Sequence, residues 1–163
     1  MAFSLTPERE KALEKLFTHY PNKRAVCIPL LHLCQEQEGW ISNDVLQFVA
    51  ERLELTPAHV QGVATFYHLF HTKPVGKHQV WVCQTLPCAL RGNLDLLHHC
   101  EKRLGIHAGE TTPDGKVTLR TAECLASCAT APMMQINKEY HEHLTLEAAD
   151  KLLDQLLADP IKE

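Results

Sequence analysis

The sequence lacks any apolar run approaching the roughly 20 residues that a transmembrane helix requires. Its first ten residues contain no apolar signal-peptide segment, and they include acidic side chains, which a transit peptide avoids. Excess positive charge is also missing: 16 lysines and arginines stand against 20 aspartates and glutamates, so no positive field attracts nucleic acid or an acidic membrane. We therefore expect a cytosolic protein, or one peripheral to a cytosolic surface, with no membrane insertion and no nucleic-acid partner.

Internal repeats and low-complexity segments are absent as well, and the composition is that of a folded protein. Hydrophobic residues make up 45% of the 163 positions and charged residues 22%, which excludes a disordered chain. The length suits one ordinary domain, or one domain with a small helical appendage.

Seven cysteines occur without a secretion signal. Because disulfides are rare in a reducing compartment, clustered cysteines there more often indicate metal or redox chemistry.

The first half of the chain has the pattern of short helices. The pair threonine-proline occurs twice in this half, and each time the threonine can cap a helix whose first residue is the proline. A second helix is expected to end at Gly39. Pro29 lies either near the start of that second helix or kinks it. Four short helices on short connections predict a small antiparallel bundle over residues 1–74. The expected helices start after Thr6, at Arg24, after Ser42 and after Thr56, and the first has an apolar face of Leu13, Leu16, Phe17 and Tyr20.

The pattern of residues 75–163 is different, with strands that alternate with helices. The order strand, helix, strand, strand, strand, helix predicts a sheet with two helices, compatible with a thioredoxin-like α/β sandwich. The expected strands cover residues 78–83, 117–121, 133–137 and 140–144, and the expected helices cover 92–104 and the segment after Thr145. The predicted inward side chains are Leu94, Leu97, Cys100 and Leu104 in the first helix and Leu146, Ala149, Leu153 and Leu156 in the second.

Four of the seven cysteines form two close pairs, Cys83 with Cys88 and Cys124 with Cys128. Each pair lies where a strand runs into a loop, so two thiolates can converge from a short stretch of free backbone. A [2Fe–2S] cluster has two irons that each need two thiolates, which two close pairs supply. We therefore predict a [2Fe–2S] cluster on these four cysteines, with each loop serving one iron. Its negative charge requires loop N–H groups that point at the sulfurs.

Other chemistry for the same cysteines is open. A structural zinc ion would also accept four thiolates, although zinc loops usually have C-x2-C spacing and these pairs are C-x4-C and C-x3-C. A thioredoxin-type dithiol would need C-x-x-C, which the sequence does not contain. A Rieske centre would replace two cysteines by histidines, and four suitable cysteines are already present. The remaining cysteines, Cys27, Cys34 and Cys100, are expected to be small core residues.

Several segments, in the same order over nearly the whole chain, resemble a known family. They are Gly39–Ile41, Gly62–Tyr67, Pro74–His78, Cys83–Cys88 with Arg91 and Gly92, and Glu123–Leu125 through Cys128 to Pro132. On these segments the chain resembles the small [2Fe–2S] subunit of NADH:quinone oxidoreductase, respiratory complex I. The same family serves NAD-linked hydrogenases and formate dehydrogenases. The resemblance implies an N-terminal helical region, residues 1–74, followed by a thioredoxin-like [2Fe–2S] ferredoxin domain, residues 75–163.

The resemblance also implies a function and a partner. The cluster on Cys83, Cys88, Cys124 and Cys128 would pass single electrons, near the flavin but off the main electron chain, and no side chain would be catalytic. In the family, NADH, FMN and a [4Fe–4S] cluster belong to a larger flavoprotein subunit, and the absence of a Gly-rich phosphate loop from this chain agrees with that. The complex would place the chain at the cytoplasmic face of the inner membrane. The first alternative is the equivalent subunit of a soluble NAD-reducing hydrogenase or formate dehydrogenase, and the second, less favoured, is a zinc-stabilised interaction domain. Where the family commonly has glycine, this chain has Ala126.

Overall fold

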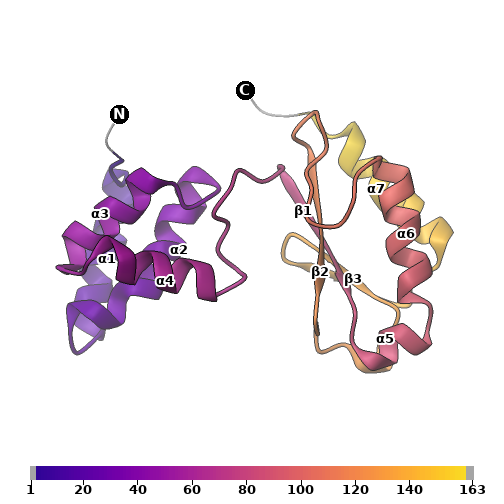
Figure 1. The fold of residues 1–163 in the computed structure, drawn as a ribbon, viewed down its shortest axis with the longest axis horizontal. Coiled ribbons are helices and arrows are strands. Elements are labelled where there is room, and N and C mark those ends of the chain that lie inside the picture. Colours follow the sequence, from indigo (N-terminus) through magenta and orange to yellow (C-terminus); the bar gives the residue numbers. More distant parts are fainter. Residues whose placement is uncertain (1–2, 161–163) are drawn as a thin grey trace. The chain divides into compact units, whose positions relative to one another are not determined.

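Figure 1 shows a computed structural model of the chain, which describes residues 3–160. Its internal contacts divide the chain into two compact units, residues 1–74 and 75–163. The first unit is helical in all its regular structure within the described residues. Its elements are α1 (Pro7–His19), a short 3₁₀ turn η1 (Lys23–Val26), α2 (Cys27–Glu38), α3 (Asn43–Leu53) and α4 (Pro57–Phe66).

Side-chain caps start three of these helices at the predicted positions. The hydroxyl oxygens of Thr6, Ser42 and Thr56 accept hydrogen bonds from backbone N–H groups three residues further along, which satisfies donors that have no partner inside the helix. The second helix starts later than predicted, because the 3₁₀ turn occupies the residues before Cys27. Pro29 therefore lies in the first turn of α2, where its missing N–H costs no hydrogen bond.

The helices of the first unit enclose one apolar core. Cys27 and Cys34 of α2 are both buried in it, as predicted, together with Leu13, Leu30, Leu31 and Val49. Tyr20 does not belong to that core, contrary to the prediction, because α1 ends at His19 and Tyr20 has an extended backbone that leaves the side chain exposed.

The second unit is built on a four-stranded sheet in the order β2-β1-β3-β4. The parallel pair β1 and β2 is joined through α6, and β3 and β4 form an antiparallel hairpin whose first strand pairs with β1. The strands are β1 (His78–Cys83), β2 (Val117–Ala122), β3 (Met134–Ile136) and β4 (Glu139–His141), and the helices are α5 (Leu86–Leu90), α6 (Asn93–Leu104) and α7 (Leu146–Ala158). The predicted fold class and the order of the long elements are confirmed, whereas α5 was not predicted.

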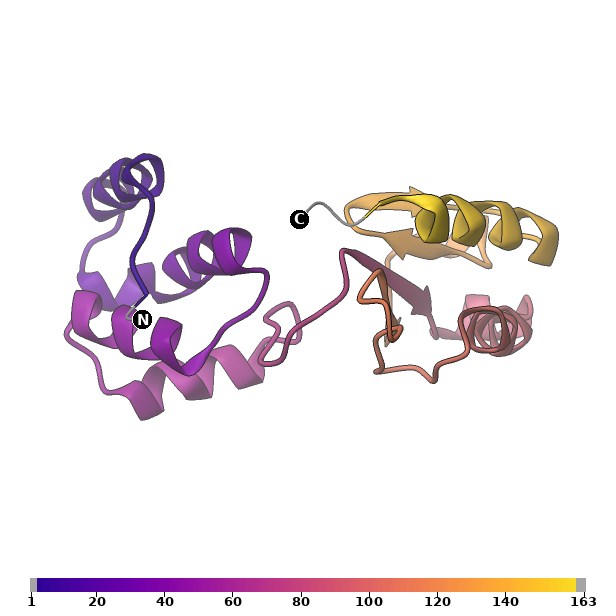
Figure 2. The same ribbon diagram turned by 90° about the horizontal axis from the view of Figure 1, so that it is seen from above.

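Helices α6 and α7 lie side by side against one face of the sheet (Figure 1), α6 over β1 and β2 and α7 toward the β3–β4 hairpin (Figure 2). The core between them holds alternate residues of the strands, such as Val80, Val82 and Leu119, because successive strand side chains point to opposite faces. In the residues described, no helix is both long enough and apolar enough to cross a membrane.

Two of the predicted inward side chains are exposed. Leu94 is 58% exposed because the buried stripe of α6 runs through Asn93, Leu96, Cys100 and Leu104, one position away from it. Leu146 is 39% exposed because it is the first residue of α7, where a side chain leans back beyond the end of the helix. The other predicted residues of both helices are buried or partly buried.

Candidate metal centre

Cys83 is the last residue of β1 and is held on two sides. Its side chain is buried, its position pairs with Ala122 of the parallel strand, and its N–H donates to the carbonyl of Met133 at 3.4 Å. Its own carbonyl accepts a hydrogen bond from the side-chain amide of Asn93 at 3.0 Å. Asn93 is itself buried at the start of α6, directly after Gly92 in the left-handed conformation. The sequence analysis did not single out Asn93, although a polar residue at a helix start after glycine is a signal for such a role.

Cys88 lies in α5, a single helical turn with Pro87 in its first turn. Between the first two cysteines, Leu86 and Pro87 are therefore helical, and only Gln84 and Thr85 belong to the free loop that was predicted. Cys88 is fully buried, and burial raises the pKa of its thiol to about 11, helped by a hydrogen bond and charge interaction with Cys83. A backbone hydrogen bond from Met133 acts in the opposite direction, lowering that pKa by stabilising the thiolate. The first pair is thus in mutual contact and shielded from water.

Cys124 and Cys128 lie in the segment after β2 and are both exposed. The N–H of Ala126, between them, donates a hydrogen bond to the sulfur of Cys124 at 3.3 Å. Ala126 adopts the left-handed conformation, with φ of 59°, which explains physically why a glycine would suit this position. Cys128 begins the short 3₁₀ turn η2 (Cys128–Thr130) and forms a hydrogen bond with Cys124. The contact from the Ala126 N–H to sulfur is of the kind that a thiolate cluster requires.

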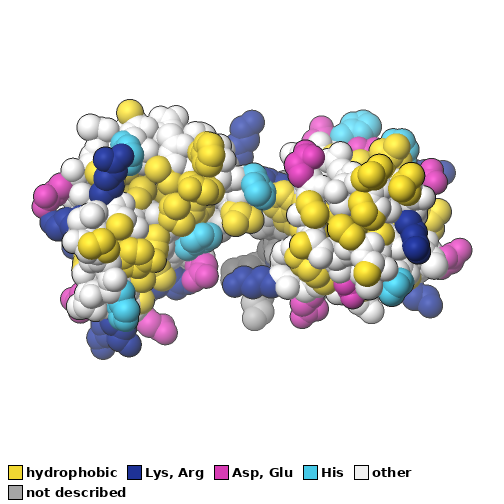
Figure 3. Space-filling model, turned by 90° about the horizontal axis from the view of Figure 1, so that it is seen from below, with side chains coloured by type: hydrophobic (Ala, Val, Ile, Leu, Met, Phe, Trp, Pro, Cys, Tyr) yellow, Lys and Arg dark blue, Asp and Glu magenta, His cyan; other side chains and the backbone are white. Residues whose placement is uncertain are grey.

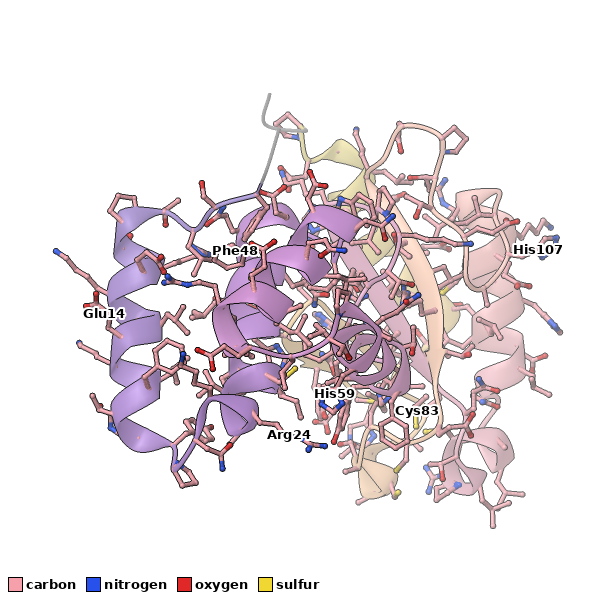
Figure 4. The ribbon with its side chains drawn as sticks, turned by 60° about the vertical axis from the view of Figure 1, so that its left-hand side comes forward. Glu14, Arg24, Phe48, His59, Cys83 and His107 are labelled. Atoms are coloured by element: carbon pink, nitrogen blue, oxygen red, sulfur yellow. The ribbon has the colours of Figure 1, made fainter. Side chains whose placement is uncertain are left out.

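The two pairs lie close to each other in the structure. The charge of Cys83 contributes to raising the pKa of Cys128, and Cys128 contributes to raising that of Cys88, although desolvation is the largest cause for both. Cys83 and Cys88 share a small apolar cluster with Ala131 and Met133, against which Leu125 of the second loop packs. Figure 4 shows sulfur atoms gathered beside Cys83. The ends of β1 and β2 therefore bring all four predicted cysteines into one region.

The donor set of this region fits a [2Fe–2S] cluster. Four thiols occur in two pairs, each pair in internal contact, with backbone N–H groups on the sulfurs of Cys88 and Cys124. Over residues 3–160, no three His, Cys, Asp or Glu side chains, these cysteines included, lie close enough together to hold a metal ion, so the thiols come together as two pairs and not as one ligand group. Because ligating thiols must be deprotonated, raised pKa values at Cys88 and Cys128 mean that cluster binding releases protons.

The other three cysteines are placed in the cores. Cys27 and Cys34 lie in the core of the first unit and Cys100 in the core between the sheet and its helices, so none belongs to the cluster region. Burial raises the pKa of Cys34 to about 12 and that of Cys100 to about 11, as expected for inert structural thiols.

The sheet order, the parallel β1–α6–β2 unit and the following hairpin with α7 define a thioredoxin-like α/β fold with cysteines at the ends of its two parallel strands. The model of the family described as thioredoxin-like [2Fe-2S] ferredoxin matches residues 13–157. The chain belongs to this family, which confirms the expected resemblance.

Relatives of known name agree with this assignment. A subunit of the NADH-quinone oxidoreductase of Rickettsia felis is 42% identical over 160 residues, which cover 96% of this chain and 96% of the relative. NADH dehydrogenase [ubiquinone] flavoprotein 2, mitochondrial, of Dictyostelium discoideum is 42% identical over 94% of this chain and 64% of that protein. Among solved structures, a chain of the NAD+-reducing [NiFe]-hydrogenase has a TM-score of 0.73 at 22% identity, covering 82% of this chain and 23% of that chain, which shows the shared fold alone.

Proposed function

We propose that the chain is the [2Fe–2S] electron-transfer subunit of an NADH:quinone oxidoreductase. The observation that carries the proposal is the meeting of two cysteine pairs at the ends of β1 and β2. The sequence identity to the Rickettsia felis NADH-quinone oxidoreductase protein, over nearly the whole of both chains, supports the same function. In this function Cys83, Cys88, Cys124 and Cys128 hold the cluster, and no side chain of the chain acts as an acid, base or nucleophile.

The cluster, when bound, accepts and releases one electron at a time. The residues of this chain determine the environment of the cluster. Buried Cys83 and Cys88 shield one side from water, while exposed Cys124 and Cys128 leave the other side within reach of a partner. The N–H of Ala126 and the backbone hydrogen bond from Met133 stabilise the negative charge on the sulfurs.

The proposed partner is the larger flavoprotein subunit that binds NADH and FMN, and with it a location at the cytoplasmic face of the inner membrane. Hydrophobic side chains gather on the surface of each unit (Figure 3), as is common where a protein meets a partner. On α4, an open hollow of about 410 Å³ lies beside Phe66, which is 79% exposed. Near the cysteines, Leu86 and Leu90 of α5 and Leu94 of α6 are exposed.

Iron and acid-labile sulfide measurements on anaerobically purified protein test the cluster assignment. We expect about two irons and two sulfides per chain. Replacing Cys83, Cys88, Cys124 or Cys128 by serine should remove the cluster or strongly perturb its spectrum. Cys100→Ser is the matched control, because Cys100 lies in the core between the sheet and its helices, away from the four cysteines. The spectrum of the cluster should not change in this variant. A colourless protein that contains zinc and no sulfide would refute the cluster and favour the zinc-stabilised alternative.

Affinity purification from cells tests the partner. A flavin-containing subunit should co-purify with the wild-type chain, and Phe66→Ser should reduce its recovery without unfolding the chain, since Phe66 is largely exposed. Leu146→Ser, a change of an exposed side chain on α7, is the control. Recovery of the chain alone would contradict the partner proposal, and co-purification of hydrogenase or formate dehydrogenase subunits would favour that alternative.

A further inference from the structure

The second cysteine loop is tied to the segment after β4 through one carboxylate. Glu142, one residue beyond β4, accepts hydrogen bonds on a single oxygen from the hydroxyls of Ser127 and Thr130, the latter at 2.7 Å. The two hydroxyl oxygens are themselves 2.7 Å apart. Ser127 and Thr130 lie on either side of Cys128 and Ala129. The carboxylate therefore joins both ends of the turn that carries the thiol of Cys128.

Backbone hydrogen bonds extend this connection in both directions. The N–H of His143 donates to the carbonyl of Thr130 at 2.8 Å, and the N–H of Leu144 donates to the carbonyl of Pro132 at 3.0 Å. Within the turn, the N–H of Thr130 donates to the carbonyl of Ser127 at 3.2 Å. Glu142 is thus held at a defined place beside the turn, and its side chain adds the contact that the backbone bonds do not make.

Glu142 is charged in this position. The hydrogen bonds from Ser127 and Thr130 lower the pKa of its carboxyl group, since they stabilise the ionised form. Glu142 is itself exposed, so one contact to its carboxylate would contribute little. Here two hydroxyls converge on one oxygen, and hydrogen bonds to a charged group are stronger than those between neutral groups.

We propose that Glu142 is a positioning residue for the cluster: it clamps the turn that holds Cys128, and its negative charge lowers the cluster's reduction potential. The proposal rests on the function proposed above. The clamp follows from the contacts to Ser127 and Thr130. The effect on potential follows from Coulomb's law, because an electron added to an already negative cluster is repelled by a nearby carboxylate.

Amide hydrogen exchange of the cluster-free protein tests the clamp without any cofactor. Glu142→Ala removes the acceptor, and we expect exchange in a peptide covering residues 124–130 to become about two- to fivefold faster, as for the loss of contacts to an exposed charged group. Glu142→Gln keeps a carbonyl oxygen as acceptor and should exchange much more slowly than the alanine variant. Glu139→Gln, on the exposed strand β4, is the control for losing one charge. Equal exchange in Glu142→Ala and the wild-type chain would overturn the clamp.

Redox titration of the cluster-loaded protein tests the charge. Glu142→Gln should shift the reduction potential in the positive direction, with cluster retention like that of the wild-type chain, and the shift should shrink as salt is added. Glu139→Gln should give a smaller shift. Equal potentials for Glu142→Gln and the wild-type chain would overturn the effect of the charge. A wild-type chain that binds no iron would overturn the proposed function together with the charge effect, while hydrogen exchange would still decide the clamp.

Discussion

The N–H of Ala126 donates to the sulfur of Cys124 at 3.3 Å, and the same residue has a left-handed backbone, with φ of 59°. A side chain with a Cβ atom is strained in that conformation, by about 1–2 kcal/mol for L-residues in general. The loop between Cys124 and Cys128 therefore carries a local steric cost at the residue whose N–H contacts the sulfur of Cys124. This relationship makes position 126 a direct test of the loop.

Replacing Ala126 by glycine should raise the free energy of unfolding of the cluster-free protein by up to about 1 kcal/mol, because the steric strain is relieved while the flexible unfolded chain takes back part of the gain. Thermal or denaturant unfolding measures this change. Ala129→Gly is the matched control, since Ala129 lies in the η2 turn, and we expect it to be destabilising. An Ala126→Gly variant less stable than the wild-type chain would contradict the left-handed conformation.

Asn93→Ala should destabilise the second unit, because the carbonyl of Cys83 loses its side-chain donor in a buried place. The expected loss is about 1–3 kcal/mol, the usual cost of leaving a buried polar group unsatisfied. Denaturant unfolding measures it, and a cluster-loaded sample should also lose iron faster. Leu94→Ala, at the next position but exposed, should change stability by less than about 0.5 kcal/mol. Equal effects of the two variants would argue against this placement of α6.

Alkylation of the folded, cluster-free protein at pH 8 should separate the cysteines into two groups. Cys124 and Cys128 are exposed and should be modified, whereas Cys34 and Cys100 are fully buried, with pKa values of about 12 and 11. The thiolate is the reactive form, so both buried thiols should remain unmodified. Peptide mass spectrometry identifies the modified sites, and unfolded protein, in which all seven should react, is the control. Rapid modification of Cys34 in the folded chain would show that the helical core is wrong.

Asp159, just after α7, should contribute stability that depends on pH. Lys77 and His78 at the start of β1 both contact its carboxylate, at 2.7 and 2.8 Å, and their hydrogen bonds lower its pKa below the ordinary value of 3.8. A lowered pKa in the folded state means that this stabilisation is present above the unfolded pKa and is lost as pH falls through the folded one.

We therefore expect Asp159→Asn to be less stable than the wild-type chain near pH 6, with the difference shrinking as the pH falls below 3.8, the ordinary pKa of the carboxyl group. Unfolding curves at a series of pH values measure it. Glu139→Gln serves as the control for removing one negative charge. A difference that persists or grows at low pH would exclude ionisation of Asp159 as its cause.

Much of the fold was predictable because its signals are local. The caps at Thr6, Ser42 and Thr56 and the stop at Gly39 depend only on neighbouring residues, and the structure has them where the sequence indicated. The short helix α5 was missed because one helical turn has no periodicity to detect. Leu94 was misplaced because the direction of a helix face depends on which stripe meets the sheet, here the one through Leu96 and Cys100.

The sequence by itself determined the four candidate ligands, since the spacing of Cys83 with Cys88 and of Cys124 with Cys128 is a property of the chain alone. Only the tertiary structure decided that the two pairs meet, because parallel pairing of β1 and β2 brings residues some forty positions apart to the same edge of the sheet. It also decided which pair is buried, and it showed that Asn93 contacts the carbonyl of Cys83 and that Glu142 contacts the turn of Cys128. These hydrogen bonds join separate elements, so they depend on how those elements pack; residue order signals only the place of Asn93 at a helix start after Gly92, and not its partner.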